Sequence, residues 1–293
     1  MECDFCRATG LLVAEAVSSN INGNPDAESD PRQRPNGLGE VSPVSVKRKM
    51  RDLLEDEKSP FFMSLPPKFR DHPENYRILE SRGRERKQIE KELGDIKNYD
   101  PEKYFKSVFV QKYWDARVFG NTFLEKGGNK GYIKTGVIQV GMGLSISPIN
   151  IIRQTNTNKA GVEEGKDQGM APMAYRVVEH AVYCVPFFVN PNMANKTGCT
   201  ADDIELFKLL LPYIYDLNRS AIRPDIRIRH AWYVEHNSIL GSCPDYQILE
   251  ALTPERISNP NDPSESWRDY IDKTELPPEI LSRVKSCVDL VNP

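Results

Sequence analysis

Long hydrophobic runs are missing from this chain of 293 residues. No uninterrupted apolar segment approaches the roughly 20 residues of a membrane-spanning helix, which excludes an integral membrane protein. The mean hydropathy is low, at -0.54, yet 39% of the residues are hydrophobic. That share suffices for a sizeable core and argues against wholesale disorder. The length corresponds to one large domain or two small ones.

Excess charge of either sign is also absent. Lys and Arg together number 39, Asp and Glu 42, and the formal net charge is -3. This balance excludes a surface coated uniformly with positive charge. If the protein binds nucleic acid, its basic side chains must gather on one face while acidic residues cover the others.

Cysteine is sparse, with six residues scattered along the chain. Only Cys3 and Cys6 have the spacing of metal ligands, and no second Cys-x-x-Cys or paired histidine completes a zinc site. The first residues lack the basic region of a secretory signal. Free thiols in a chain of this kind lead us to expect a cytoplasmic protein without a bound metal.

Known catalytic motifs are absent from the sequence. It contains no His-Glu-x-x-His, no Gly-x-Ser-x-Gly and no Gly-Lys-Ser/Thr phosphate loop. His180 and His230 lie inside apolar, strand-like segments, where a histidine usually has a structural role in the core. Residues 141–143 (GMG) form half of a glycine fingerprint and are not followed by a helical pattern. We therefore expect neither enzyme activity nor a cofactor.

Hydrophobic periodicity and turn residues predict the main elements. Helices are expected at about 43–54, with Ser42 as its N-cap, and after Thr200, where apolar residues recur at helical spacing. That second apolar stripe comprises Ile204, Phe207, Leu210, Leu211, Ile214 and Leu217. Strands are expected at 11–20, 105–110, 132–140, 176–189 and 227–235.

Three stretches depart from this pattern. Residues 60–104 are mostly polar, with alternating charge at 81–91, and predict a helical insertion. Residues 153–172 lose all apolar periodicity, which indicates a functional loop, and 254–293 predict an irregular C-terminal segment. The remaining order of elements matches the βαββαβ pattern of a ferredoxin-like sheet. We predict a single α+β domain over 1–293 with large inserted loops.

A basic cluster lies at the start of the first helix. Lys47 and Arg51 are four residues apart and are expected on one helix face with Arg48 beside them, opposite Val46 and Met50. Such a cluster after a loop rich in Asn and Gly can bind phosphates through side chains and backbone N–H groups together. A solvated helix face without a ligand is the alternative. Arg117 allows two interpretations as well: a nucleic-acid contact, or a buried structural pair with Asp115.

Several blocks in this order resemble the Cas-seven (Cas7) family, the crRNA-binding backbone of the CRISPR surveillance complex Cascade, and its type I-C branch in particular. The blocks are residues 19–26 (SNINGNPD), 44–51 (VSVKRKMR), 115–120 (DARVFG), 135–149 (TGVIQVGMGLSISPI), 216–221 (DLNRSA) and 236–241 (HNSILG). Residues 115–120 match the family's Asp-x-Arg-x-Phe-Gly. The resemblance extends from residue 17 to about 280.

The resemblance implies a modified RRM-like palm with inserted fingers, a web and a thumb-like loop at 153–173. It also implies residues that bind RNA. Those positions are Asn22, Asn24, Lys47, Arg48, Arg51, Arg117, Gln139, Gly141, Ser145, Met170, Met173 and Arg176. In this picture the methionines wedge against bases, and Arg176 stands where the family has a lysine.

The function implied is that of a non-catalytic subunit that oligomerises along the crRNA in a helical filament and presents the guide to target DNA. The other partners implied are further copies of the chain, a large subunit and a Cas-five-type subunit, with no membrane involved. A metal-dependent ribonuclease of the type III backbone kind is the alternative. It would use an aspartate of the first loop, and Asp26 and Asp30 are the acids at that place.

Overall fold

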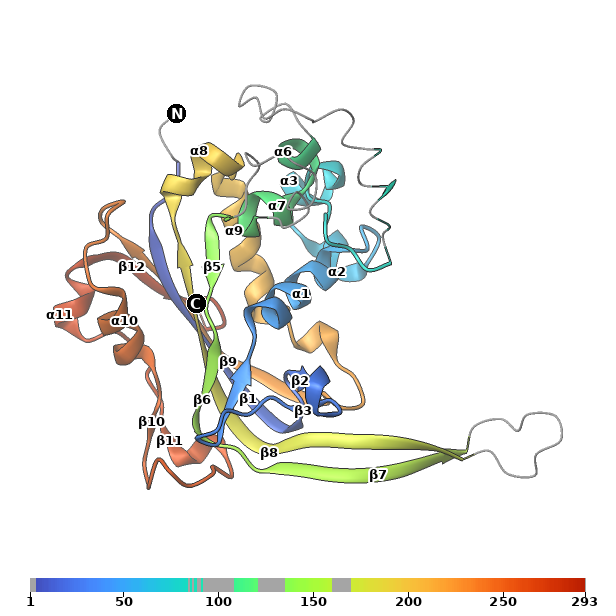
Figure 1. Ribbon diagram of the computed structural model, residues 1–293. Coiled ribbons are helices and arrows are strands. Elements are labelled where there is room, and N and C mark those ends of the chain that lie inside the picture. The colour runs from blue at the N-terminus through green and yellow to red at the C-terminus, as the bar shows by residue number, and fades with distance from the viewer. Residues whose placement is uncertain are drawn as a thin grey trace.

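A large antiparallel sheet organises the molecule (Figure 1). The computed structural model describes residues 4–83, 108–120, 135–159 and 170–292, with the single positions 85, 87, 88 and 91. Within them, one eight-stranded sheet has the order β12–β9–β1–β8–β6–β4, and β5 and β7 pair with other parts of β8. The strands are β1 (Ala8–Ser19), β4 (Leu38–Val41), β5 (Ile138–Val140), β6 (Gly143–Pro148), β7 (Ile151–Lys159), β8 (Met170–Val189), β9 (Asp225–His236) and β12 (Val284–Asp289).

Helices and short strand pairs surround this sheet. The short pairs are β2 (Gly23–Asn24) with β3 (Asp30–Pro31) and β10 (Glu255–Arg256) with β11 (Tyr270–Ile271). The helices are α1 (Pro43–Leu54), α2 (Pro60–Ser64), α3 (Pro67–Arg70), α6 (Val108–Lys112), α7 (Trp114–Phe119), α8 (Ala194–Thr197), α9 (Ala201–Leu210), α10 (Asp245–Leu252) and α11 (Pro278–Leu281). The expected mixture of helices with an antiparallel sheet is confirmed. No helix in the described ranges is long and apolar enough to span a membrane.

Both faces of the central strand β1 are buried. Side chains alternate along a strand, so Leu12 and Ala14 enter one core while Leu11 and Val13 enter another. Figure 1 shows α1, α7 and α9 on the first side of the sheet and α10, α11, β10 and β11 on the second. Neither face at the centre of the sheet is therefore open to a ligand. A ligand would bind at the loops or at the edges of the sheet.

The capping signals located two helices correctly. The Ser42 side chain accepts a hydrogen bond from the Ser45 N–H and begins α1. Thr200 and Asp203 form a reciprocal capping box at the start of α9. The predicted stripe of α9 is buried as far as Ile214, whereas Leu217 is 53% exposed. The helix ends before Leu217, so helical spacing no longer determines the direction of that side chain.

The prediction of a strand at 105–110 is wrong where the structure describes it. Residues 105–107 lie outside the described residues, and Val108–Lys112 form helix α6. Its β-branched and aromatic residues favour a strand, but tertiary contacts override such preferences. Here the Val110 carbonyl accepts a hydrogen bond from Arg117 in α7 at 2.7 Å. The strand expected at 132–140 is reduced to Ile138–Val140, and 132–134 lie outside the described part.

The stretch expected to lack regular structure is a long hairpin arm, which we define as Ile151–Lys159 of β7 with residues 170–178 of β8. The two segments pair in register from Ile151 opposite Val178 to Lys159 opposite Met170. The arm extends away from the sheet (Figure 1). Residues 153–172 lack the alternation of apolar and polar residues by which a strand is recognised, and that is why the sequence pattern did not reveal the arm. Residues 160–169 lie outside the described part.

Candidate nucleic-acid interface

Helix α1 distributes its basic residues over several environments. Lys47 is half-buried, with its Nζ atom 5.2 Å from the centroid of the Phe119 ring in α7. Burial lowers the pKa of Lys47, and the nearby positive charge of Arg51 lowers it further. A cation held beside an aromatic ring and lacking a carboxylate partner among the described residues is suited to receive an anion. Lys47 remains a candidate phosphate ligand.

Arg51 shares the face of Lys47, as expected, since its guanidinium lies 5.5 Å from the same Phe119 ring, but it is buried. It is 4% exposed, and its Nε atom donates to Asp115 Oδ2 at 2.8 Å. A second ion pair joins Arg51 to Glu80 at 2.9 Å. Because Asp115 approaches from α7, the two carboxylates draw Arg51 into the contact between helices. Its observed contacts are structural.

Arg48 lies on the other flank of α1 and is largely neutralised. Its guanidinium is 2.7 Å from Glu55 and 3.5 Å from Asp52, and it also donates to the backbone carbonyl of Glu80. An RNA phosphate at this position would compete with two carboxylates that are already in place.

Arg117 is a buried structural residue. It is 5% exposed and makes a two-pronged contact with Asp203 of α9, at 2.6 and 2.9 Å. It also donates to the carbonyls of Val110 and Asn75. Burial alone would lower the pKa of Arg117, but the charge and hydrogen bonds of Asp203 raise it. The structural interpretation of Arg117 is thus supported, although its partner is Asp203 and not Asp115.

The three candidates on β5, on β6 and between these strands also serve the fold. Ser145 is 3% exposed, accepts a hydrogen bond from the Gly39 N–H at 2.8 Å and donates to the Ser147 carbonyl. The Gly141 N–H donates to the Pro186 carbonyl at 2.8 Å, and a Cβ at Gly141 would lie 2.9 Å from the Pro186 ring. Gln139 is half-buried and donates to the Gly136 carbonyl. Of the three, only the Gln139 side chain reaches the surface.

The first loop is anchored to the N-terminus of α1. Asn22 Oδ1 accepts a hydrogen bond from the Ser42 N–H at 2.7 Å, which places this asparagine beside the N-cap. Asn24 caps the short 3-10 helix Pro25–Ala27 by accepting from the Asp26 N–H. Both side chains are half-buried. The structure thereby brings Asn22 and the start of α1 together, as the expected site requires.

A carboxylate clamp joins the first loop to the base of the arm. Arg153 of β7 and Arg176 of β8 are opposite each other in register, and both bind Asp30, at 2.8 and 3.0 Å. Arg176 also pairs with Glu28. Hydrogen bonding from Arg153 lowers the pKa of Asp30, as does Arg176, against the opposing effect of burial. Asp30 is thus a fully charged anchor for the arm. Met170 and Met173 lie farther along β8, and their side chains are outside the described part.

Comparison with models of known protein families identifies the family of this chain. The model of CRISPR-associated protein Cas7 matches residues 6–275. The chain belongs to the Cas7 family. No curated protein matches it.

Three solved structures are similar to this Cas7 chain at low sequence identity. A chain of "CRISPR RNA-guided surveillance complex, pre-nicking" is 13% identical, with 78% of each chain covered and a TM-score of 0.45. A chain of "Cryo-EM structure of the Type III-B Cmr-beta bound to cognate target RNA" is 9% identical, with 78% of this chain and 61% of that chain covered and a TM-score of 0.39. A chain of "CRISPR RNA-guided surveillance complex" is 14% identical, with 76% and 68% covered and a TM-score of 0.37.

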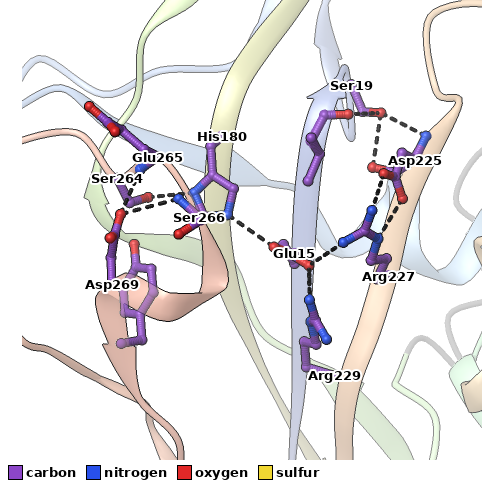
Figure 2. Close-up of polar contacts among 12 residues, drawn as sticks. Glu15, Ser19, His180, Asp225, Arg227, Arg229, Ser264, Glu265, Ser266 and Asp269 are labelled. Carbon is purple, nitrogen blue, oxygen red and sulfur yellow. Dashed lines mark hydrogen bonds and ion pairs between the residues drawn. The ribbon is translucent and has the colours of Figure 1, made fainter.

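One polar network in this Cas7 chain has the order of a serine-histidine-acid triad (Figure 2). Ser264 Oγ lies 2.8 Å from His180 Nδ1, and His180 Nε2 lies 3.1 Å from Glu15. Ser264 is only 4% exposed, so a substrate has no access to its hydroxyl. Glu15 is bound in addition by Arg229 at 2.6 Å. The network is buried, and both ring nitrogens of His180 have hydrogen-bond partners. His180 is a core histidine, as expected.

Sequence reasoning missed four cations that meet beside the second half of α1. Lys49, Arg82, Arg219 and Arg223 line one pocket there. The available signal was the position of Lys49, because helical spacing places it among Val46, Met50 and Leu53 on the buried stripe. A lysine on an apolar stripe usually has a specific partner or a functional role.

Proposed function

We propose that the chain is a non-catalytic backbone subunit of a type I-C Cascade complex, which oligomerises along the guide crRNA and presents it for pairing with target DNA. Its membership of the Cas7 family carries this proposal, because the matched region, residues 6–275, includes the first loop, α1 and the arm. The sequence blocks quoted above favour the type I-C branch. The proposed partners are further copies of the chain, a large subunit and a Cas-five-type subunit, and the proposed location is the cytoplasm.

The order of the central strands supports the proposal of an RRM-like palm. Strands β9, β1, β8 and β6 are neighbours in that order, α1 lies between β1 and β6 in the chain, and α9 lies between β8 and β9. This is the neighbour order of a βαββαβ sheet. Since both faces of β1 are covered, the guide in this proposal follows the first loop and the start of α1, past Asn22 and Lys47.

The arm corresponds to the proposed thumb. A two-stranded ribbon is at best marginally stable by itself in water, which favours a role in which the arm is completed by RNA or by another copy. The clamp of Asp30 on Arg153 and Arg176 holds its base against the first loop. In this proposal, Met170 and Met173 wedge against bases.

Shortening the arm tests its role. Thr155 and Ala174 are opposite each other in register, so replacing residues 156–173 by Asn-Gly would close a tight hairpin at that pair. We expect the melting temperature of the monomer to stay within about 2 °C of the parent, because the sequence of the removed segment is mostly polar and offers little apolar surface. Assembly on guide RNA, measured by filament length and by nuclease protection of the guide, should be lost. Equal length and equal protection would identify the removed segment as a surface insertion.

The surroundings of Asp30 favour the non-catalytic function over the ribonuclease alternative. Asp30 is occupied by two arginines, which leaves its carboxylate unsuited to act as a base. Asp26 lies exposed on the short 3-10 helix of the first loop. The ribonuclease alternative therefore depends chiefly on Asp26.

The proposed function is tested with labelled single-stranded guide RNA. We expect the purified chain to bind the guide without cutting it, and Lys47→Ala to lower the salt slope of log affinity by about 0.7, independent of sequence. Lys273→Gln, on the C-terminal segment, is the matched control and should keep the parent slope. Cleavage that Asp26→Ala abolishes would establish the ribonuclease instead, and no binding in a filter assay would overturn both functions.

A further inference from the structure

A positively charged pocket lies between the second half of α1 and the segment that leads into β9. Its volume is about 410 Å³. The charged residues that line it are Lys49, Arg82, Arg219, Arg223, Asp52 and Glu55. Four cations face two carboxylates, so the lining has a formal charge of +2.

The two carboxylates of the pocket are already engaged. Asp52 is 2.9 Å from Arg82 and 3.5 Å from Arg48, and Glu55 is 2.7 Å from Arg48. Lys49 consequently has only a distant carboxylate partner, with its Nζ atom 3.9 Å from Asp52. Arg219 pairs with Asp216 at 3.1 Å, but both side chains are more than half exposed, and such a pair contributes little.

Lys49 and Arg223 are the poorly compensated cations. Lys49 is 7% exposed, and burial together with the charge of Arg223 lowers its pKa to about 8, with Asp52 opposing the shift. The buried Nε atom of Arg223 has no hydrogen-bond partner in the described structure. Two neighbouring cations that line one space and repel each other create a demand for an anion with several oxygen atoms.

We propose that this pocket is a phosphate-binding site formed by Lys49 and Arg223, with Arg219 at its rim. A phosphate offers enough acceptors for the Lys49 ammonium and the Arg223 guanidinium at once, and its negative charge relieves their repulsion. The source we assign is a backbone phosphate of single-stranded RNA, and this assignment rests on the proposed function. The pocket is distinct from the Lys47 side of α1, because Lys47 contacts α7 and Lys49 faces the segment 217–223.

The first experiment uses inorganic phosphate as the probe. At a concentration about tenfold above its dissociation constant, phosphate should raise the melting temperature of the parent by about 2–3 °C relative to chloride at equal ionic strength. Lys49→Met should abolish the specific part of this rise, whereas the Lys273→Gln control, paired with Glu255 on the other side of the sheet, should keep it. Phosphate also stabilises proteins generally, and the comparison between variants cancels that effect.

We expect Lys49→Met to fold, because methionine is close to lysine in size and the substitution removes a positive charge that Arg223 repels. Lys49→Met should melt no lower than the parent in chloride. In the parent, phosphate binding should weaken as the pH rises from about 8 to about 10, because Lys49 loses its proton there while inorganic phosphate stays a dianion. The other charged groups facing Lys49 are those of Arg48, Arg82, Arg223, Asp52 and Glu55. Equal phosphate shifts in the parent and Lys49→Met would overturn the proposal.

The second experiment uses single-stranded RNA. Lys49→Met and Arg223→Gln should each reduce the salt slope of log affinity by about 0.7, in addition to the reduction from Lys47→Ala. A phosphate shift that depends on Lys49, combined with an unchanged RNA slope, would support the pocket and overturn RNA as its source. If the parent binds no RNA, the proposed function fails, and the thermal experiment with inorganic phosphate still decides whether the pocket binds phosphate.

Discussion

Replacing Arg117 by methionine is expected to lower the free energy of unfolding by about 3–5 kcal/mol. The substitution would leave the carboxylate of Asp203, which is 1% exposed, without its cation. It would also remove the hydrogen bonds to the carbonyls of Val110 and Asn75. Asp203 accepts from the Thr200 N–H as well, so the uncompensated charge would lie in the first turn of α9.

Urea denaturation at neutral pH measures this loss. Arg70→Met is the matched control, because Arg70 pairs with Asp71 on the surface, where such a pair contributes little. Combining Arg117→Met with Asp203→Asn should recover part of the stability, since it removes the unpaired charge. If Arg117→Met proved as stable as the parent and instead lost affinity for RNA, Arg117 would be a ligand contact and not an internal support.

The elements that the sequence predicts correctly are those determined by local chemistry. Ser42 begins α1 and Thr200 begins α9, and each side chain accepts a hydrogen bond from the N–H three residues later. Both partners of such a cap lie in one short segment, so the local sequence is enough to predict it. The central strands β1, β8 and β9 contain apolar runs whose burial follows from composition. Local rules therefore recovered the framework that holds the candidate site.

The environments of the arginines could not be predicted in the same way. Arg51 meets an aspartate 64 residues away, and Arg117 meets one 86 residues away. Helical spacing gives the direction of a side chain but not what packs against it, so the sequence could place Arg51 on the face of Lys47 but could not show that Asp115 pairs with it there. The clamp at Asp30 depends likewise on the register of β7 with β8, which no local pattern specifies.

Replacing Glu15 by glutamine is expected to cost about 1–3 kcal/mol of unfolding free energy at neutral pH. Glu15 is 2% exposed at the centre of β1, and Figure 2 shows it between His180 and the side chains of Arg227 and Arg229. Glutamine keeps the shape, so no cavity forms, but Arg229 loses its counter-charge, whereas Arg227 keeps Asp225. Glu255→Gln serves as the control, because that carboxylate is exposed and should contribute less than about 1 kcal/mol.

The pH dependence separates this charge effect from a packing effect. Burial raises the pKa of Glu15, but hydrogen bonds and charge from His180 and Arg229 outweigh burial and lower it below its usual value. The unfolded chain then binds the proton more readily, so the stabilisation by Glu15 is complete above a pH of about 4.5 and is lost as the pH falls through the lowered folded pKa. The difference in unfolding free energy between the parent and Glu15→Gln, measured in urea, should be largest at pH 6–7 and shrink steadily below about pH 4.5. A difference of the same size at pH 7 and at pH 3.5 would contradict this origin and would assign the loss to altered packing.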